Sequence, residues 1–225
     1  MLTIELAGEH LTLWPDRAIS WPARSAVLVA DLHLGKPAAF RSAGVPAPEA
    51  STEADLARLD RLMDSSRAER LIILGDLLHA KAGCAAQTMA TVGAWAQRLA
   101  SQGRRVTLVR GNHDISAGDP PAEWGFEIVD APHTMGPFAL AHEPQEFGAD
   151  LYTLAGHLHP AVMLDCPTGA AMRAPCFWLG PRVGVLPAFG SFTGARAVRP
   201  SRHDRVYVIG DGAVVEVSTP MSARA

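Results

Sequence analysis

Short apolar runs in this chain repeatedly end at a residue that can bind a metal ion. The run at 106–110, for example, is followed by Gly111-Asn112-His113-Asp114. Apolar runs of this length are typical of strands buried on both faces. Five of them lead to seven such side chains, which are Asp31, His33, Asp76, Asn112, His142, His157 and His159. Because loops at the carboxyl ends of strands converge in open α/β sheets, we expect these side chains to form one site.

The segments between the first three runs have a helical pattern. Apolar residues recur at three- and four-residue spacing over 56–63, after Ser51 as a candidate N-cap, and again over 89–99. These patterns predict two amphipathic helices, the second across roughly 84–101. Prolines between 37 and 48 predict a long loop after the first run. The first half of the chain is therefore expected to follow a βαβαβ order.

The rest of the chain is expected to be mainly β. Residues 2–6 and 11–13 alternate like a hairpin with Gly8-Glu9-His10 as its turn. After Asp114, helical periodicity disappears and strand-like runs follow at 126–129, 137–141, 152–156, 161–165, 176–179, 183–186, 205–209 and 213–217. The predicted fold class is therefore α/β, with two packed mixed β-sheets flanked by helices. We expect one domain over residues 1–217 and a disordered tail over 218–225.

Composition limits the classes of function. No apolar run approaches the roughly 18 to 20 residues that span a membrane, and the N-terminus lacks the pattern of a signal peptide, so we expect a soluble, cytoplasmic protein. A formal net charge of -3 argues against a protein that coats nucleic acid by bulk charge. The cysteines, Cys84, Cys166 and Cys176, have no CxxC spacing. They predict buried thiols rather than a sulfur-rich metal site.

The types of the seven side chains indicate the metals and the reaction. Carboxylates, imidazoles and an amide oxygen suit Mn²⁺, Fe or Zn²⁺. Seven ligands exceed what one ion uses, whereas two ions that share a bridging carboxylate use that number. Two ions roughly 3.5 to 4 Å apart can hold a phosphoryl group and activate a bridging water for in-line attack on the phosphorus. The predicted chemistry is phosphoester hydrolysis with two divalent ions, foremost Mn²⁺.

The motifs around these residues occur in a recognisable order. They are Asp31-Leu32-His33, Gly75-Asp76, Gly111-Asn112-His113-Asp114, His142 and Gly156-His157-Leu158-His159. As a set, they resemble the calcineurin-like metallophosphoesterase superfamily. Segments 31–36, 175–179 and 186–194 are similar to those of the bacterial ligase-associated DNA damage response endonucleases within it. This resemblance covers nearly the whole chain. It implies a phosphodiesterase or endonuclease that acts on nucleic acid in DNA repair, with a DNA ligase and helicase as partners.

The same resemblance implies a role for each site residue. One metal would be held by Asp31, His33, Asp76 and His159, and the other by Asp76, Asn112, His142 and His157. Asp76 would bridge the two ions. His113 would bind no metal but would face the phosphate and stabilise or protonate the leaving oxygen, with Asp114 fixing its ring.

Several other polar residues allow two interpretations. His79 stands where the superfamily often has an acidic residue, and it is either a residue that orients a ligand or an ordinary loop histidine. Arg173 is either a contact for a substrate phosphate or a surface residue. One dense basic run either follows a nucleic-acid backbone or is simply solvated, with Arg199 and Arg202 as its substrate-binding candidates. The run consists of Arg196, Arg199, Arg202 and Arg205.

Two other functions compete with the nuclease. The same metals would serve a phosphatase or pyrophosphatase that acts on a small nucleotide. Outside enzymes, the alternative is a metal-free, protein-binding scaffold of the same fold. A scaffold has no reason to keep seven polar residues at strand ends, so the pattern favours the enzyme. It favours no particular oligomeric state.

Overall fold

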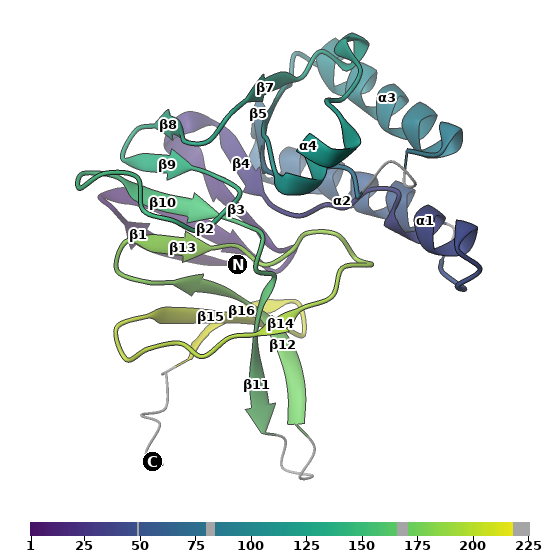
Figure 1. Cartoon of the computed structure of the whole chain (residues 1–225). Coiled ribbons are helices and arrows are strands. Elements are labelled where there is room, and N and C mark those ends of the chain that lie inside the picture. The colour runs from purple at the N-terminus through teal and green to yellow at the C-terminus, as the bar shows by residue number, and fades with distance from the viewer. Residues whose placement is uncertain (49, 80–83, 166–170, 218–225) are drawn as a thin grey trace.

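The structure, a computed structural model, describes residues 1–48, 50–79, 84–165 and 171–217. Two β-sheets pack face to face, and two long helices cover the outer face of the first sheet (Figure 1). This arrangement confirms the predicted fold class of two packed mixed sheets flanked by helices. The predicted tail at 218–225 lies outside the described residues.

The first sheet contains seven strands that lie in the order of the chain. They are β1 (Leu2–Leu6), β2 (Glu9–Trp14), β3 (Ala18–Trp21), β4 (Ala26–Val29), β5 (Arg70–Leu74), β6 (Arg105–Val109) and β7 (Glu127–Val129). Strands β1 to β4 pair antiparallel, and β4 to β7 pair parallel. The first turn is shorter than predicted, because Glu9 pairs with Leu6 and His10 with Glu5. Strand β3 was not expected, since four residues are too few to show a period.

Four α-helices accompany this sheet: α1 (Lys36–Ser42), α2 (Ser51–Ser66), α3 (Ala86–Ser101) and α4 (Asn112–Ala117). Helices α2 and α3 match the predicted pair, although Ser51 is the first helical residue and Ala50 stands at the N-cap without a side-chain bond. Helix α1 lies where a loop was predicted. Pro37 does not prevent it, because a proline at the start of a helix lacks only an N–H that would be unpaired there anyway.

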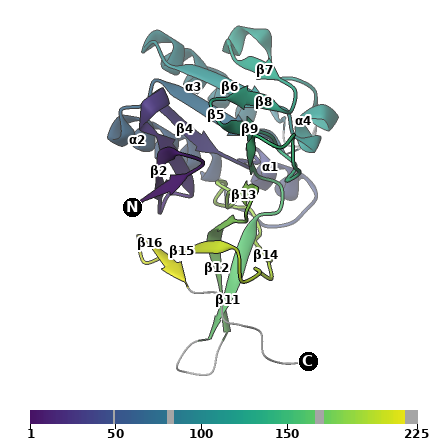
Figure 2. The ribbon, with the colours of Figure 1, turned by 90° about the vertical axis from the view of Figure 1, so that its left-hand side faces the viewer.

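The second sheet contains nine strands. They are β8 (His133–Met135), β9 (Phe138–Leu140), β10 (Tyr152–Ala155), β11 (Pro160–Asp165), β12 (Ala171–Leu179), β13 (Val183–Val185), β14 (Arg196–Ala197), β15 (Arg205–Gly210) and β16 (Ala213–Val217). Their order is β14-β11-β12-β13-β10-β9-β8, with β15 between β12 and β16. Strands β9, β10 and β13 are parallel. The hairpin of β11 and β12 extends beyond the other strands of the second sheet (Figure 2).

Two apolar layers hold this arrangement together. Between the sheets, Leu28 and Leu74 of the first sheet share a cluster with Phe138 and Leu154 of the second, and all four are fully buried. Under the helices, Trp95 belongs to a second cluster. Burial of such side chains is worth about 1.5 to 3 kcal/mol each. The two layers therefore fix the carboxyl ends of β4, β5 and β6 against those of β9 and β10.

The described cysteines, Cys84 and Cys176, are at least partly buried, in line with the prediction of buried thiols. Cys176 is buried, which raises the pKa of its thiol to about 12. Cys84 is half-buried, and Cys166 lies outside the described residues. Among the helices of the described residues, none has the length and apolar character needed to cross a membrane.

Candidate metal centre

The structure brings all seven predicted ligands together at one edge of the two sheets. Asp31 and His33 follow β4, Asp76 follows β5, and Asn112 opens the helix after β6. His142 follows β9, and His157 and His159 follow β10. The first sheet thus supplies four of the side chains and the second sheet three. The site exists only because the sheets are packed with these strand ends side by side.

One group of four side chains converges around His33. Its Nε2 lies 3.3 Å from Nε2 of His159 and 3.7 Å from Oδ2 of Asp76. Oδ1 of Asp31 lies 3.3 Å from the same nitrogen of His159. These are the four residues that the family resemblance implies for one metal ion.

A second group of four converges around His142. Its Nε2 lies 2.9 Å from Oδ1 of Asn112, 3.0 Å from Nδ1 of His157 and 3.4 Å from Oδ1 of Asp76. Asp76 therefore turns one carboxylate oxygen toward each group. A carboxylate in this position is suited to bridge two ions.

The charges and protonation of these groups fit divalent cations. Asp31 and Asp76 are 0% and 2% exposed, and within the described residues the basic side chains within 4 Å of their carboxylates are all histidines, which carry a charge only when protonated. Buried carboxylates need a positive partner. Burial lowers the pKa of His33 to about 2, and His159 adds to this effect. A neutral imidazole keeps the lone pair that binds a metal.

The backbone at the ligands is unusual. Five of the seven ligands have a positive φ, between 47° and 70°: Asp31, His33, Asp76, His157 and His159. Such conformations are costly for residues other than glycine and cluster at functional sites. At Gly111, the absence of a side chain lets the backbone lie close to Asp76, because a Cβ there would be 2.4 Å from Oδ1 of Asp76. The backbone conformation at these residues therefore allows the ligands to converge.

His113 lies beside the two groups, while Asp114 has a different role from the one expected. Nε2 of His113 is 3.9 Å from Oδ2 of Asp76, and its Nδ1 contacts the backbone carbonyl of His79. Asp114 was predicted to fix this ring. Its carboxylate instead accepts backbone N–H groups of Asp76, Leu77 and Gly111 at 2.7 to 3.0 Å. Asp114 therefore ties together the loops that carry the ligands.

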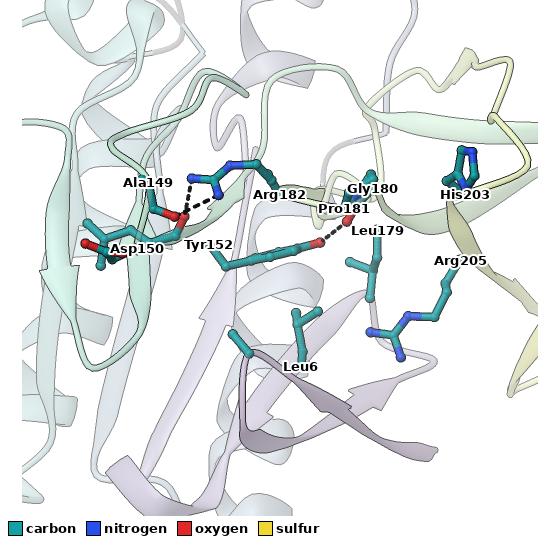
Figure 3. Close-up of a pocket in the computed structure, with 12 residues that line it drawn as sticks. Leu6, Ala149, Asp150, Tyr152, Leu179, Gly180, Pro181, Arg182, His203 and Arg205 are labelled. Atoms are coloured by element: carbon teal, nitrogen blue, oxygen red, sulfur yellow. Dashed lines mark hydrogen bonds between the residues drawn. The ribbon is translucent and has the colours of Figure 1, made fainter.

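The basic run does not form one surface beside the metal centre. The backbone N–H of Arg196 donates to the carbonyl of His159. Arg205 instead lines a cavity of about 440 Å³ with Tyr152 and Arg182 (Figure 3). That cavity lies at the start of β10, whereas the ligands follow its end. Arg205 therefore lies away from the metal centre, and a contact between the run and a nucleic-acid backbone stays a prediction.

The three substrate-binding candidates have exposed side chains. Nη1 of Arg173 donates to the carbonyl of Ala195 at 2.9 Å, one residue before the segment that pairs with His159. Nε of Arg202 donates to the neighbouring His203, and Arg199 is exposed. Of the three, Arg173 has the clearest connection to the metal centre.

Sequence reasoning overlooked Lys36 and Phe40, which stand on α1 directly after the first ligand motif. Phe40 contacts His79, with ring centroids 6.5 Å apart. The available signal was the position of Lys36, which follows Asp31-Leu32-His33 by three residues. The helix that carries both residues was not predicted.

Comparison with known proteins agrees with the fold and shows the family. Residues 25–159 match the family model of the calcineurin-like phosphoesterases, so the chain belongs to that family and is a metallophosphoesterase. Among solved structures, it is similar to the crystal structure of the Pseudomonas putida nuclease MPE. The two share 46% identity over 96% of this chain and 99% of the other, with a TM-score of 0.83. No curated protein sequence matches the chain at a significant level.

Proposed function

We propose that this protein is a two-metal phosphodiesterase that cleaves nucleic acid as an endonuclease. The observation that carries this proposal is the pair of four-residue groups that share Asp76. Its likeness to a nuclease over 96% of the chain supports nucleic acid as the substrate. The intact donor set speaks against a metal-free scaffold.

Each residue has a proposed task. Asp31, His33, Asp76 and His159 hold one divalent ion, and Asp76, Asn112, His142 and His157 hold the other. When bound, the two ions would neutralise the phosphate and lower the pKa of the attacking water. His113 presents Nε2 to the reacting phosphate, because its Nδ1 is occupied by the carbonyl of His79. A protonated His113 can donate to the leaving oxygen.

The cellular role is proposed on the sequence resemblance. The segments shared with ligase-associated endonucleases favour a part in DNA repair beside a DNA ligase and a helicase, and hence action in the cytoplasm. The mixed nitrogen and oxygen donors favour Mn²⁺, with Fe or Zn²⁺ as alternatives. Arg173 is proposed to contact a phosphate of the substrate, with Arg199 and Arg202 as more remote contacts.

One experiment tests the proposal by metal content and substrate choice together. The protein is saturated with Mn²⁺, freed of excess metal and analysed for metal. It is then assayed on a single-stranded oligonucleotide, its duplex, a chromogenic phosphodiester and the matching monoester. We expect about two ions per chain and faster hydrolysis of diesters than of the monoester. Asp76→Ala should lose both ions, because each group uses this carboxylate.

The matched control is Asp150→Ala, since Asp150 is an exposed carboxylate at the cavity near the start of β10. This variant should keep the metal content and the activities of the unmodified protein. One ion or none in the unmodified protein would contradict the two-metal proposal. Hydrolysis of small phosphoesters without any cleavage of oligonucleotides would contradict the nuclease.

A further inference from the structure

A group of aromatic rings leads away from His113 at the metal centre. The ring of His79 stacks on His113 with centroids 5.2 Å apart. Phe40 lies 6.5 Å from His79, and Phe192 lies 5.5 Å from Phe40 in a perpendicular arrangement. His79, Phe40 and Phe192 are all half-buried residues. The proposed chemistry at the metal centre does not use the side chains of these three residues.

A cation stands on the same side of the site. Lys36 precedes Phe40 by four residues on α1, a spacing that places both side chains on one face of the helix. The backbone N–H of Lys36 donates to the carbonyl of His33 at 3.1 Å, which places the first turn of α1 beside this ligand. Within the described residues, no carboxylate forms an ion pair with Lys36.

The loop that carries Phe192 is held in place from several directions. Asp55 accepts the backbone N–H and the hydroxyl of Ser191 at 2.9 and 3.1 Å. The backbone N–H of Gly190 donates to the carbonyl of Asp31, and a Cβ at Gly190 would lie 2.2 Å from the carbonyl oxygen of Leu32. Phe192 is thus positioned by the same backbone that positions the metal ligands.

We propose that Phe40, Phe192 and His79 form a binding site for one nucleobase next to the scissile phosphate, with Lys36 contacting an adjacent phosphate. This inference rests on the proposed nuclease function. Half-exposed aromatic rings beside a phosphate-binding centre suit a base, because every base offers a π-face whatever its sequence. The base must be unpaired, since a base inside a duplex is already stacked on both faces.

The test compares an oligonucleotide with a substrate that lacks a base. Variants Phe40→Leu and Phe192→Leu keep an apolar side chain but lose the aromatic face. They are assayed with Mn²⁺ on a single-stranded oligonucleotide and on methyl p-nitrophenyl phosphate. The value of kcat/KM for the oligonucleotide should fall about 5- to 150-fold further than for the small diester. Phe40→Tyr should restore most of the loss, because tyrosine also stacks.

A control variant separates this site from general packing. Phe126→Leu changes another partly buried phenylalanine, which packs against Trp95 and Trp124 rather than at the site. It should leave both activities within about twofold of the unmodified protein. An oligonucleotide with abasic residues around the cleaved bond should be cut equally by the unmodified protein and the Phe40 variant. Lys36→Gln should reduce the log-log salt slope of oligonucleotide cleavage by about 0.7.

The outcomes distinguish the two proposals. Equal losses of kcat/KM on both substrates would mean that the rings serve only packing, and this would overturn the base-binding site. No loss of kcat/KM on either substrate would overturn it as well. In both cases the nuclease function would stand, since the unmodified protein would still cut the oligonucleotide. If the unmodified protein hydrolyses the small diester but never cuts the oligonucleotide, both the nuclease function and the base-binding site fail.

Discussion

The two ring nitrogens of His113 make different contacts and have different proposed tasks. Nδ1 is occupied by the His79 carbonyl, and Nε2 faces the carboxylate shared by the two ligand groups. We expect His113→Ala to keep its metal ions and to lower kcat by roughly 10² to 10⁴, the range for a lost general acid. The loss should be smaller for a p-nitrophenyl leaving group, which needs little protonation. Steady-state kinetics and metal analysis of one preparation check both points.

The control for this variant is His10→Ala, because His10 is exposed and pairs with Glu5 next to the turn between β1 and β2. It should leave kcat and metal content unchanged. Equal losses of kcat for good and poor leaving groups would instead mean that His113 stabilises charge without donating a proton. Loss of a metal ion from His113→Ala would make His113 a ligand.

For single residues, the pattern of strand ends predicted the seven side chains that converge. It did not predict the backbone conformation that brings them together. Their identity follows from local sequence, because each one comes directly after an apolar run. The positive φ of His33 or His159 depends on contacts with distant segments, and so does the bond between His113 and the His79 carbonyl. The family resemblance implied that Asp114 fixes the His113 ring, whereas its carboxylate accepts backbone N–H groups of Asp76, Leu77 and Gly111.

The side chain of Asp114 helps to join the loops after β5 and β6. The carboxylate of Asp114 is 2% exposed and accepts three backbone N–H groups, two of them from Asp76 and Leu77. A buried donor left without a partner costs about 1 to 3 kcal/mol. Asp114→Ala should therefore lower the free energy of unfolding by at least about 2 kcal/mol and weaken metal binding, because Asp76 is no longer held. Asp114→Asn should have a smaller effect.

Urea unfolding in the presence of a chelator, followed by metal titration of the folded variants, measures these two effects. The control is Asp119→Ala, which removes an exposed partner of Arg110 near the same helix. An exposed ion pair is worth about 0 to 1 kcal/mol, so this variant should change little. If Asp114→Ala were no worse than the control, the bonds of Asp114 would contribute nothing to the site.

Elements with a long repeat were predictable, and short ones were not. Helices α2 and α3 show several turns of apolar spacing, and β4, β5 and β6 are continuous apolar runs. Strands β8 and β14 have three and two residues, which is too short to establish a period. Helix α1 was obscured by its proline. These short elements are formed by their neighbours in the fold, which sequence spacing does not report.

Across the whole molecule, the candidate metal centre joins the two sheets, because the proposed ligands follow β4, β5 and β6 in one sheet and β9 and β10 in the other. Mn²⁺ should therefore stabilise the folded protein, by about 2.7 kcal/mol per site at 100 times Kd. Mutations between the sheets should weaken metal binding more than mutations elsewhere in the core. Leu154→Ala, between the sheets and three residues before His157, tests this expectation against Leu59→Ala, which lies under the helices.

Both leucines are fully buried, and each change should cost about 2 to 5 kcal/mol of stability. Metal affinity, measured by calorimetric titration of the folded variants, should fall for Leu154→Ala and stay close to that of the unmodified protein for Leu59→Ala. Equal affinities in the two variants would mean that the packing of the sheets does not control the centre.

The left-handed backbone at five of the ligands also bears on how such a chain changes over generations. A strained residue costs of order 1 to 3 kcal/mol, and glycine at the same position avoids most of that cost. A lineage released from selection for catalysis would gain stability by drifting to glycine at Asp31, His33, Asp76, His157 or His159. Glycine would be more stable at each of these positions. If a descendant keeps aspartate and histidine there, selection still maintains the reaction.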